Sequence, residues 1–147
     1  MNPAFVGLLR ALSEADARYL IVGAYAVTFH SRPRATGDLD IWVEATPGNA
    51  ARVMRALEAF GAPLQELSAA DLVTPGIVYQ IGVPPRRIDI LTSLTGLTFD
   101  EAWRGHVTGP FGDLECPFIG RAELARNKRA LGRPRDLADL EMLGESG

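Results

Sequence analysis

Two aspartates one residue apart, Asp38 and Asp40, stand at the head of an apolar run that reads DLDIWVE. Alternate side chains of a strand share a face, so both carboxylates and Trp42 are expected on one side of it. The two carboxylates are then about 6.5–7 Å apart along the backbone, close enough to converge on one cation. Such oxygen ligands suit magnesium and leave positions for water and phosphate. The structural alternative is a solvated strand start in which Asp38 caps a turn after Gly37.

A third aspartate, Asp89, lies in the otherwise apolar part of the segment RRIDILT. Burying an unpaired carboxylate is costly, so such an acid is neutralised, ion-paired or bound to metal. If its strand lies beside that of Asp38 and Asp40, three carboxylates meet on one face of a sheet. The alternative is an ion pair from Asp89 to Arg86 or Arg87.

The segment YLIVGAYAV reads as a strand, a glycine turn and a helix. Gly23 ends the strand and the helix starts near Ala24, which turns backbone N–H groups at a helix N-terminus toward solvent. Such groups bind phosphate oxygens. Junctions of this kind occur in most α/β proteins, so a plain tight turn is the alternative.

Several other side chains are candidates for contact with a nucleotide. Lys128, in the basic segment ARNKRALGRPR, offers a point charge for phosphates, or else is a solvated helix residue. Asp136 falls in the first turn of the last expected helix, where the helix dipole favours an acid regardless of function. Arg34 is a loop residue that could reach a phosphate. Trp42 either stacks on a base or packs in the core.

Composition limits the other classes of function. The chain has 147 residues, 47% of them hydrophobic, and a net charge of -3, which fits one globular domain over residues 1–147. One cysteine, Cys116, and two histidines, His30 and His106, cannot provide an internal disulfide or a zinc cage, so any metal is held by oxygen. No apolar run approaches the ~20 residues of a membrane span and no signal peptide is evident, so the protein is expected in the cytoplasm.

The periodicity of apolar residues, with the glycine and proline positions, predicts an α+β domain. Helices are expected over 3–17, 24–30, 47–60, 99–103, 121–130 and 134–143, and Thr46 is the expected N-cap of the third. Strands are expected over 19–22, 38–44, 77–81 and 87–91, with a small hairpin within 106–119. The strands at 77–81 and 87–91 are separated by GVPP and are expected to be antiparallel.

The segments YLIVGAYAV, RATGDLDIWVE, RRIDIL and NKRALGRPRDLADL together resemble the nucleotidyltransferase superfamily of the polymerase-beta type, in particular its small bacterial AbiEii-like and minimal members. The resemblance spans residues 19–140. It implies a nucleotidyltransferase-like fold, with a small mixed twisted sheet, flanking helices and a C-terminal helical pair. It also implies a magnesium cofactor, replaceable by manganese, and a nucleoside triphosphate as substrate.

The resemblance assigns roles to individual positions. The positions that match metal-binding and catalytic acids are Asp38, Asp40 and Asp89. The positions that match nucleotide-binding residues are Gly23, Ala24, Thr36, Lys128 and Asp136. One departure is Ala24, because the family turn usually has Gly-Gly or Gly-Ser, and a serine hydroxyl contact to phosphate is missing here.

Two hypotheses about function follow. The first is a magnesium-dependent nucleotidyltransferase that acts on a hydroxyl of an RNA end such as tRNA, of a protein side chain or of a small molecule, within a toxin–antitoxin system or outside one. The second is a catalytically weak binding module of the same fold, acting as an antitoxin or regulatory subunit. Under either hypothesis an oligomer is compatible with the sequence and no membrane partner is expected.

Overall fold

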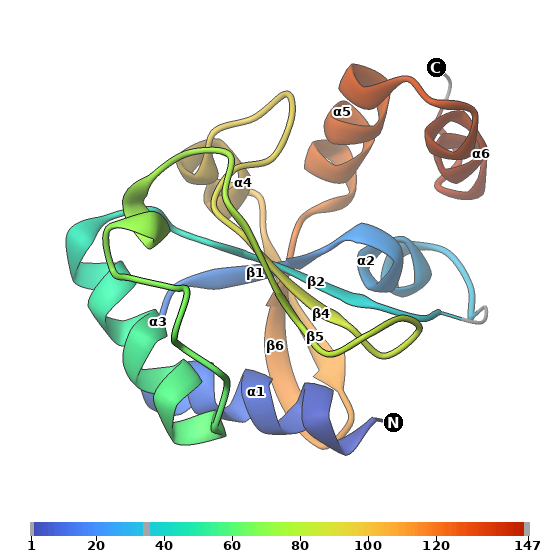
Figure 1. Ribbon diagram of the computed structural model, residues 1–147. Coiled ribbons are helices and arrows are strands. Elements are labelled where there is room, and N and C mark those ends of the chain that lie inside the picture. The colour runs from blue at the N-terminus through green and yellow to red at the C-terminus, as the bar shows by residue number, and fades with distance from the viewer. Residues whose placement is uncertain (1, 34–35, 146–147) are drawn as a thin grey trace.

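The computed structural model describes residues 2–33 and 36–145 of the chain (Figure 1). The helices are α1 (Pro3–Glu14), α2 (Gly23–His30), α3 (Pro47–Phe60), α4 (Phe99–Arg104), α5 (Arg121–Leu131) and α6 (Pro134–Met142), with a short 3₁₀ turn, η1 (Asp71–Val73). The strands are β1 (Tyr19–Val22), β2 (Leu39–Val43), β3 (Val78–Ile81), β4 (Ile88–Leu91), β5 (Val107–Phe111) and β6 (Leu114–Phe118).

Within the described residues, six strands form one mixed sheet in the order β3-β4-β2-β1-β6-β5. The pairs β1–β2, β3–β4 and β5–β6 are antiparallel, whereas β2–β4 and β1–β6 are parallel. The parallel pairing of β2 with β4 requires a long connection, which α3, η1 and β3 provide. The predicted α+β class, the antiparallel pair and the hairpin are therefore confirmed.

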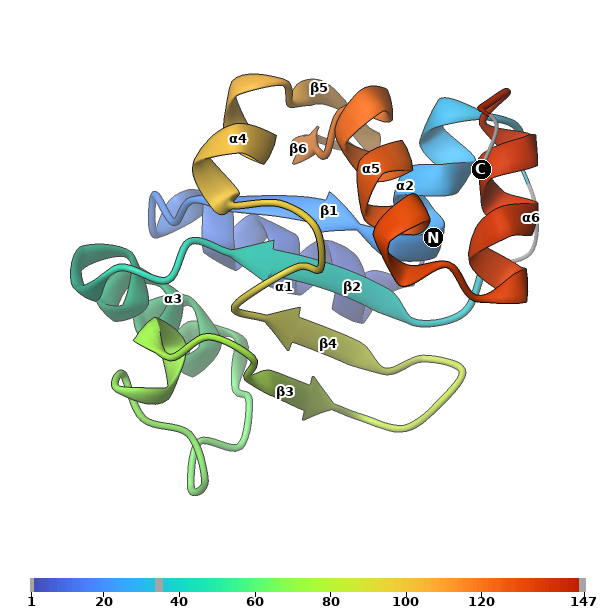
Figure 2. The same ribbon diagram turned by 90° about the horizontal axis from the view of Figure 1, so that it is seen from above.

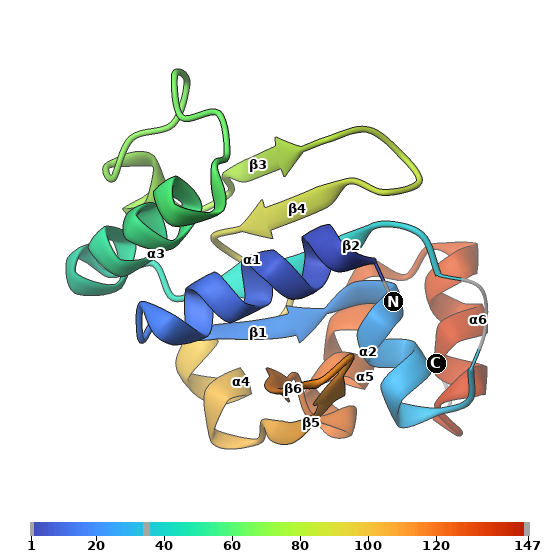
Figure 3. The same cartoon turned by 90° about the horizontal axis from the view of Figure 1, so that it is seen from below.

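Helices cover both faces of this sheet. From below, α1 and α3 lie across one face (Figure 3), and from above α4 and α5 lie on the other, with α2 and α6 beyond the end of β1 (Figure 2). Every residue of β1 is buried, as expected for a central strand with both faces covered. In the adjacent strands, Ile41 pairs with Ile21 on one side and with Ile90 on the other, and all three are buried in the core. The predicted C-terminal helical pair is present as α5 and α6.

The local signals for the helix ends act as expected. The side chain of Asn2 accepts a hydrogen bond from the Ala4 N–H and caps α1, which begins with a proline. Thr46 caps α3, and Gly61 ends it in the left-handed conformation. Asn49 then joins α3 to both central strands, because its buried amide accepts from the Arg18 N–H and donates to the carbonyls of Arg18 and Glu44.

Several predicted boundaries differ from the observed ones. The first helix ends at Glu14 rather than near residue 17, because Asp16 takes a positive φ of 58° and breaks the helical path. The strand predicted over 38–44 spans Leu39–Val43. Asp38 therefore precedes the strand, and its carboxylate accepts a hydrogen bond from the Arg87 N–H. None of the helices in the described residues combines the length and apolar character needed to cross a membrane.

Candidate active site

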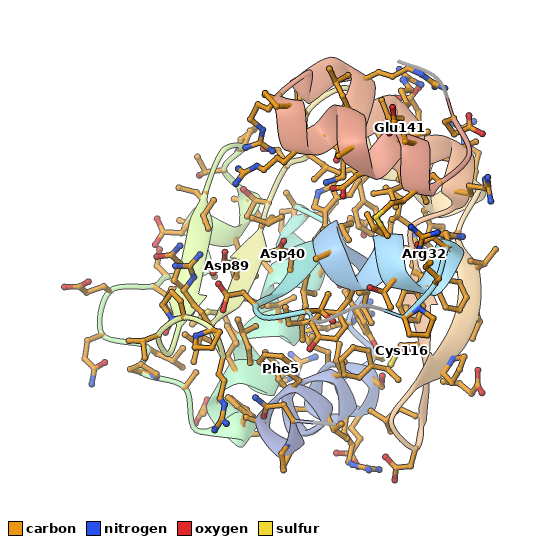
Figure 4. All side chains as sticks on the ribbon, turned by 90° about the vertical axis from the view of Figure 1, so that its right-hand side faces the viewer. Phe5, Arg32, Asp40, Asp89, Cys116 and Glu141 are labelled. Carbon is orange, nitrogen blue, oxygen red and sulfur yellow. The ribbon has the colours of Figure 1, made fainter. Side chains whose placement is uncertain are left out.

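The three aspartates singled out in the sequence lie together at one end of the β2–β4 pair. Asp40 of β2 is directly opposite Asp89 of β4 in the parallel register, and Asp38 immediately precedes β2. Figure 4 shows Asp40 and Asp89 side by side on the sheet, with the C-terminal helices above them. Asp89 is only 8% exposed. The sequence prediction that their strands are neighbours is confirmed.

The glycine turn after β1 faces this acid cluster. Val22 pairs with Asp40, so the chain leaves β1 at Gly23 directly beside the Asp40 carboxylate. Gly23 has a φ of +67°, and a Cβ at this position would lie 2.2 Å from Asp40 Oδ2. Only glycine fits here, because the backbone conformation is strained for other residues and the space is already filled. The turn therefore brings the start of α2 against the acids.

The surroundings of Asp40 disfavour the charged form of its carboxyl group. Its burial and the negative charges of Asp89 and Asp38 raise its pKa to about 6, a rise that the positive charge of Lys128 opposes. Burial disfavours the charged form, and nearby like charges disfavour it further. The cluster thus carries more negative charge than its surroundings neutralise, which is the electrostatic condition that favours binding of a cation.

Arg87 neutralises part of this charge. Its Nε and Nη2 donate to Asp89 Oδ1 and Oδ2 at 2.7 and 3.2 Å, and its Nη2 lies 3.6 Å from Asp38 Oδ2. Of the two arginines considered from the sequence, Arg87 is therefore the ion-pair partner of Asp89. The hydrogen bonds to Asp89 raise the pKa of Arg87 further, so the guanidinium stays charged.

A second charged cluster faces the acids from α5 and α6. Lys128 Nζ lies 3.0 Å from Asp139 Oδ2 and 3.5 Å from Asp136 Oδ1. Lys128 is only 8% exposed, so its interpretation as a solvated helix residue is wrong. Asp136 is fully buried and accepts hydrogen bonds from the Nε and backbone N–H of Arg133, which hold its pKa below the usual range.

These residues line one cavity of about 470 Å³. Its lining residues are Gly23, Ala24, Asp38, Asp40, Arg87, Asp89, Lys128, Arg133, Arg135 and Asp139. The carboxylates of Asp38, Asp40 and Asp89 lie on the sheet side, whereas the cations at positions 128, 133 and 135 come from the C-terminal helical region. A metal–triphosphate complex needs this combination of oxygen ligands and phosphate-binding cations.

The structure brings most of the predicted site residues together, with two exceptions. Thr36 lines a different cavity, near Gly37 and Arg86, and Asp136 lies behind Lys128 instead of lining this one. Arg34 is outside the described residues. Trp42 is 2% exposed and packs edge-to-face on Phe99, which confirms the packing interpretation over base stacking.

Four cavity residues were not identified from the sequence: Arg87 as a site residue, Arg133, Arg135 and Asp139. A signal for Asp139 was present, because it follows Asp136 by three residues and so shares its helix face. The two arginines flank Pro134 in the segment noted as basic. Their direction toward the acids depends on how α6 packs, which the sequence pattern does not specify.

The donor set fits a hard divalent cation in kind and in place, since it consists of carboxylate oxygens from neighbouring strands. Across residues 2–33 and 36–145, however, no three His, Cys, Asp or Glu side chains are already arranged around a common metal position. The guanidinium of Arg87 instead engages two of the three carboxylates, those of Asp38 and Asp89.

Comparison with known proteins identifies the fold. No family model and no curated protein sequence matches the chain. Among solved structures, the chain shares the fold of nucleotidyltransferases. One is a proposed nucleotidyltransferase from Thermotoga maritima, TM1012, with a TM-score of 0.60, 13% identity, and coverage of 96% of this chain and 92% of that one. Another is the lincosamide antibiotic adenylyltransferase LnuA with bound lincomycin, with a TM-score of 0.58, 14% identity, and coverage of 98% and 96%.

Proposed function

We propose that this protein is a magnesium-dependent nucleotidyltransferase that moves a nucleoside monophosphate from a nucleoside triphosphate to a hydroxyl acceptor. The observation that carries the proposal is the single cavity in which Asp38, Asp40 and Asp89 face Lys128 and two arginines. The fold shared with nucleotidyltransferase structures supports the same reaction class. Manganese is expected to replace magnesium, because both accept carboxylate oxygen ligands.

In this reaction the acceptor oxygen attacks the α-phosphorus and pyrophosphate leaves in line. Asp38, Asp40 and Asp89 would hold the divalent metal, which supplies activation of the attacking oxygen and neutralisation of the leaving one. Asp89, the most enclosed of the cavity acids on the sheet side, would accept the proton of the hydroxyl.

The phosphates would bind on the opposite side of the cavity. Lys128 is held in place there by Asp139 and Asp136, and Arg133 and Arg135 also line the cavity. The backbone N–H groups at the start of α2, near Gly23 and Ala24, would add hydrogen bonds to phosphate oxygens. Because Ala24 has no hydroxyl, the turn contributes backbone donors alone.

The acceptor is proposed at the level of its chemistry, as a hydroxyl of tRNA, of a partner protein or of a small molecule. A toxin–antitoxin role in the AbiEii-like branch remains part of the proposal, resting on the sequence resemblance. The alternative function is a binding module of this fold. The ion pairs that Arg87 forms with two of the acids favour that alternative, because they satisfy these acids without a metal.

The test is transfer of label from α-labelled nucleoside triphosphates, with magnesium, to total tRNA, cell protein and small hydroxyl compounds. Asp89→Asn should keep triphosphate binding and lose transfer by about 10²–10⁴-fold, the usual cost of removing a general base. Asp113→Asn is the matched control, because Asp113 is an exposed acid that pairs with Arg10 away from the cavity. If Asp89→Asn only lowers the melting temperature and retains wild-type transfer, Asp89 has a structural role.

A further inference from the structure

Arg87 forms ion pairs with two acids of the cluster that would bind the metal. Its two hydrogen bonds to Asp89 and its approach to Asp38 use carboxylate oxygens that would also ligate a divalent cation. The guanidinium takes one lone pair of each oxygen that it contacts, and its positive charge lowers the affinity of the cluster for a second cation. Asp40 takes part in none of the hydrogen bonds or salt bridges described for Arg87.

The Arg87 side chain is placed to leave the acids without unfolding the strand. It is 27% exposed and lines the same cavity as the phosphate-binding cations. Its backbone N–H separately donates to Asp38 Oδ1 at 2.9 Å, a contact that rotation of the side chain leaves in place. Asp38 therefore stays oriented while its other oxygen is released. A triphosphate in the cavity would offer the guanidinium a new set of anionic oxygens.

We propose that Arg87 is the resident counter-ion of the acid cluster, and that it leaves Asp38 and Asp89 for the phosphates when a nucleotide binds. The proposal rests on the proposed function. Its consequence is an order of binding: the divalent metal enters together with the triphosphate and binds weakly without it. Arg87 then has two roles in the reaction. Before the nucleotide binds, it weakens the binding of free metal to the acids, and afterwards it neutralises negative charge on the phosphates.

The experiment measures Mn²⁺ affinity without nucleotide, from the electron paramagnetic resonance signal of free Mn²⁺. Arg87→Gln should bind Mn²⁺ about two- to fivefold more tightly than wild type, the weight of one partly exposed ion pair in the binding equilibrium. Arg86→Gln is the matched control, since it removes the same charge from an exposed neighbour that does not line the cavity. The control should change the affinity less than twofold.

Calorimetry with the preformed complex of Mn²⁺ and α,β-methylene ATP supplies the second readout. The ranking of the two affinities should reverse here. Wild type should bind the complex at least as tightly as Arg87→Gln does, because Arg87 then contacts phosphate. Circular dichroism checks that the variant is folded. If it is not, Arg87→Lys carries the test, since lysine keeps the charge and lacks the two-nitrogen contact to Asp89.

The outcomes separate the order of binding from the proposed function. Equal Mn²⁺ affinities in wild type and the Arg87 variant, with binding of the complex retained, would overturn the role of Arg87 and leave the proposed function standing. Failure of both proteins to bind the complex would overturn both. Tighter Mn²⁺ binding by the variant, together with the reversed order for the complex, supports the proposal.

Discussion

Replacing Gly23 by alanine tests how closely the turn after β1 is fitted to the acid cluster. Gly23 has a φ of +67°, and the new methyl group would lie 2.2 Å from Asp40 Oδ2 and 3.0 Å from its Cγ. The backbone strain alone costs about 1–2 kcal/mol for an L-residue. Forcing the Asp40 side chain away from its rotamer adds about 0.5–1.5 kcal/mol. We expect a total loss of about 2–3 kcal/mol in the free energy of unfolding.

The effect on transfer should be larger than the effect on stability. Asp40 must move by about 1 Å to clear the methyl group, and a displacement of that size in a catalytic group can cost about 100-fold in rate. Gly61→Ala is the control for strain alone, because Gly61 has a φ of +90° and no atom lies within 4 Å of the place its new methyl group would take. It should lose about 1–2 kcal/mol and retain full transfer activity.

Urea unfolding and label transfer, measured on both variants, decide the question. Making Gly23→Ala in an Asp40→Ala background completes a double-mutant cycle. Asp40→Ala removes the Oδ2 and Cγ atoms that lie nearest the new methyl group, so the loss of stability caused by Gly23→Ala should fall to that caused by Gly61→Ala. If Gly23→Ala matches Gly61→Ala in both stability and transfer rate in the wild-type background, the close fit between turn and acid has no functional weight and the reasoning is refuted.

Two further predictions concern Asp40 and Asp136, in the protein kept free of metal by a chelator. The pKa of Asp40 is raised from 3.8 to about 6, so the folded state binds more protons in this range and stability falls as pH rises through it. Asp40→Asn should therefore gain up to about 3 kcal/mol over wild type at pH 7, and urea unfolding below about pH 3 should show no difference. The pKa of Asp136 is lowered, chiefly by Arg133, so its contribution is present above pH 3.8 and lost as pH falls through its folded pKa. Asp136→Asn should lower the free energy of unfolding by about 2 kcal/mol at pH 7. This value is smaller than that for a fully buried ion pair because Arg133 is half exposed. A melting curve unchanged from wild type would contradict this prediction.

The part of the site that the sequence predicts is the part with a simple period. Alternation along a strand placed Asp38 and Asp40 on one face, and the same rule explains why Arg87, two residues from Asp89, is its partner and Arg86 is not. Position in the strand then distinguishes the two acids, since Asp40 lies within β2 and Asp38 lies just outside it. The alternation of polar and apolar residues does not predict that β2 begins after Asp38.

Non-local packing decided the rest. Pairing of β4 with β2 depends on a connection through α3 and β3, and no local pattern sets that register. The burial of Lys128 depends on the angle between α5 and α6, which brings Asp139 to its amino group. Thr36 matched a motif by its spacing to Asp38, yet the path of the chain before β2 takes it to another cavity. Spacing in sequence fixes a shared face within a strand but not beyond its end.

The parallel pairing of β2 with β4 also has a consequence for the protein while it is being synthesised. Asp38 and Arg87 are 49 residues apart in sequence, and Lys128 follows later still. At about 5–20 residues per second, the ribosome delivers Arg87 several seconds after Asp38. A nascent chain therefore carries the first acids in water, without Arg87 and without the cations at positions 128, 133 and 135. The cavity forms only after α5 and α6 emerge, so the growing polypeptide lacks the candidate active site for most of its synthesis.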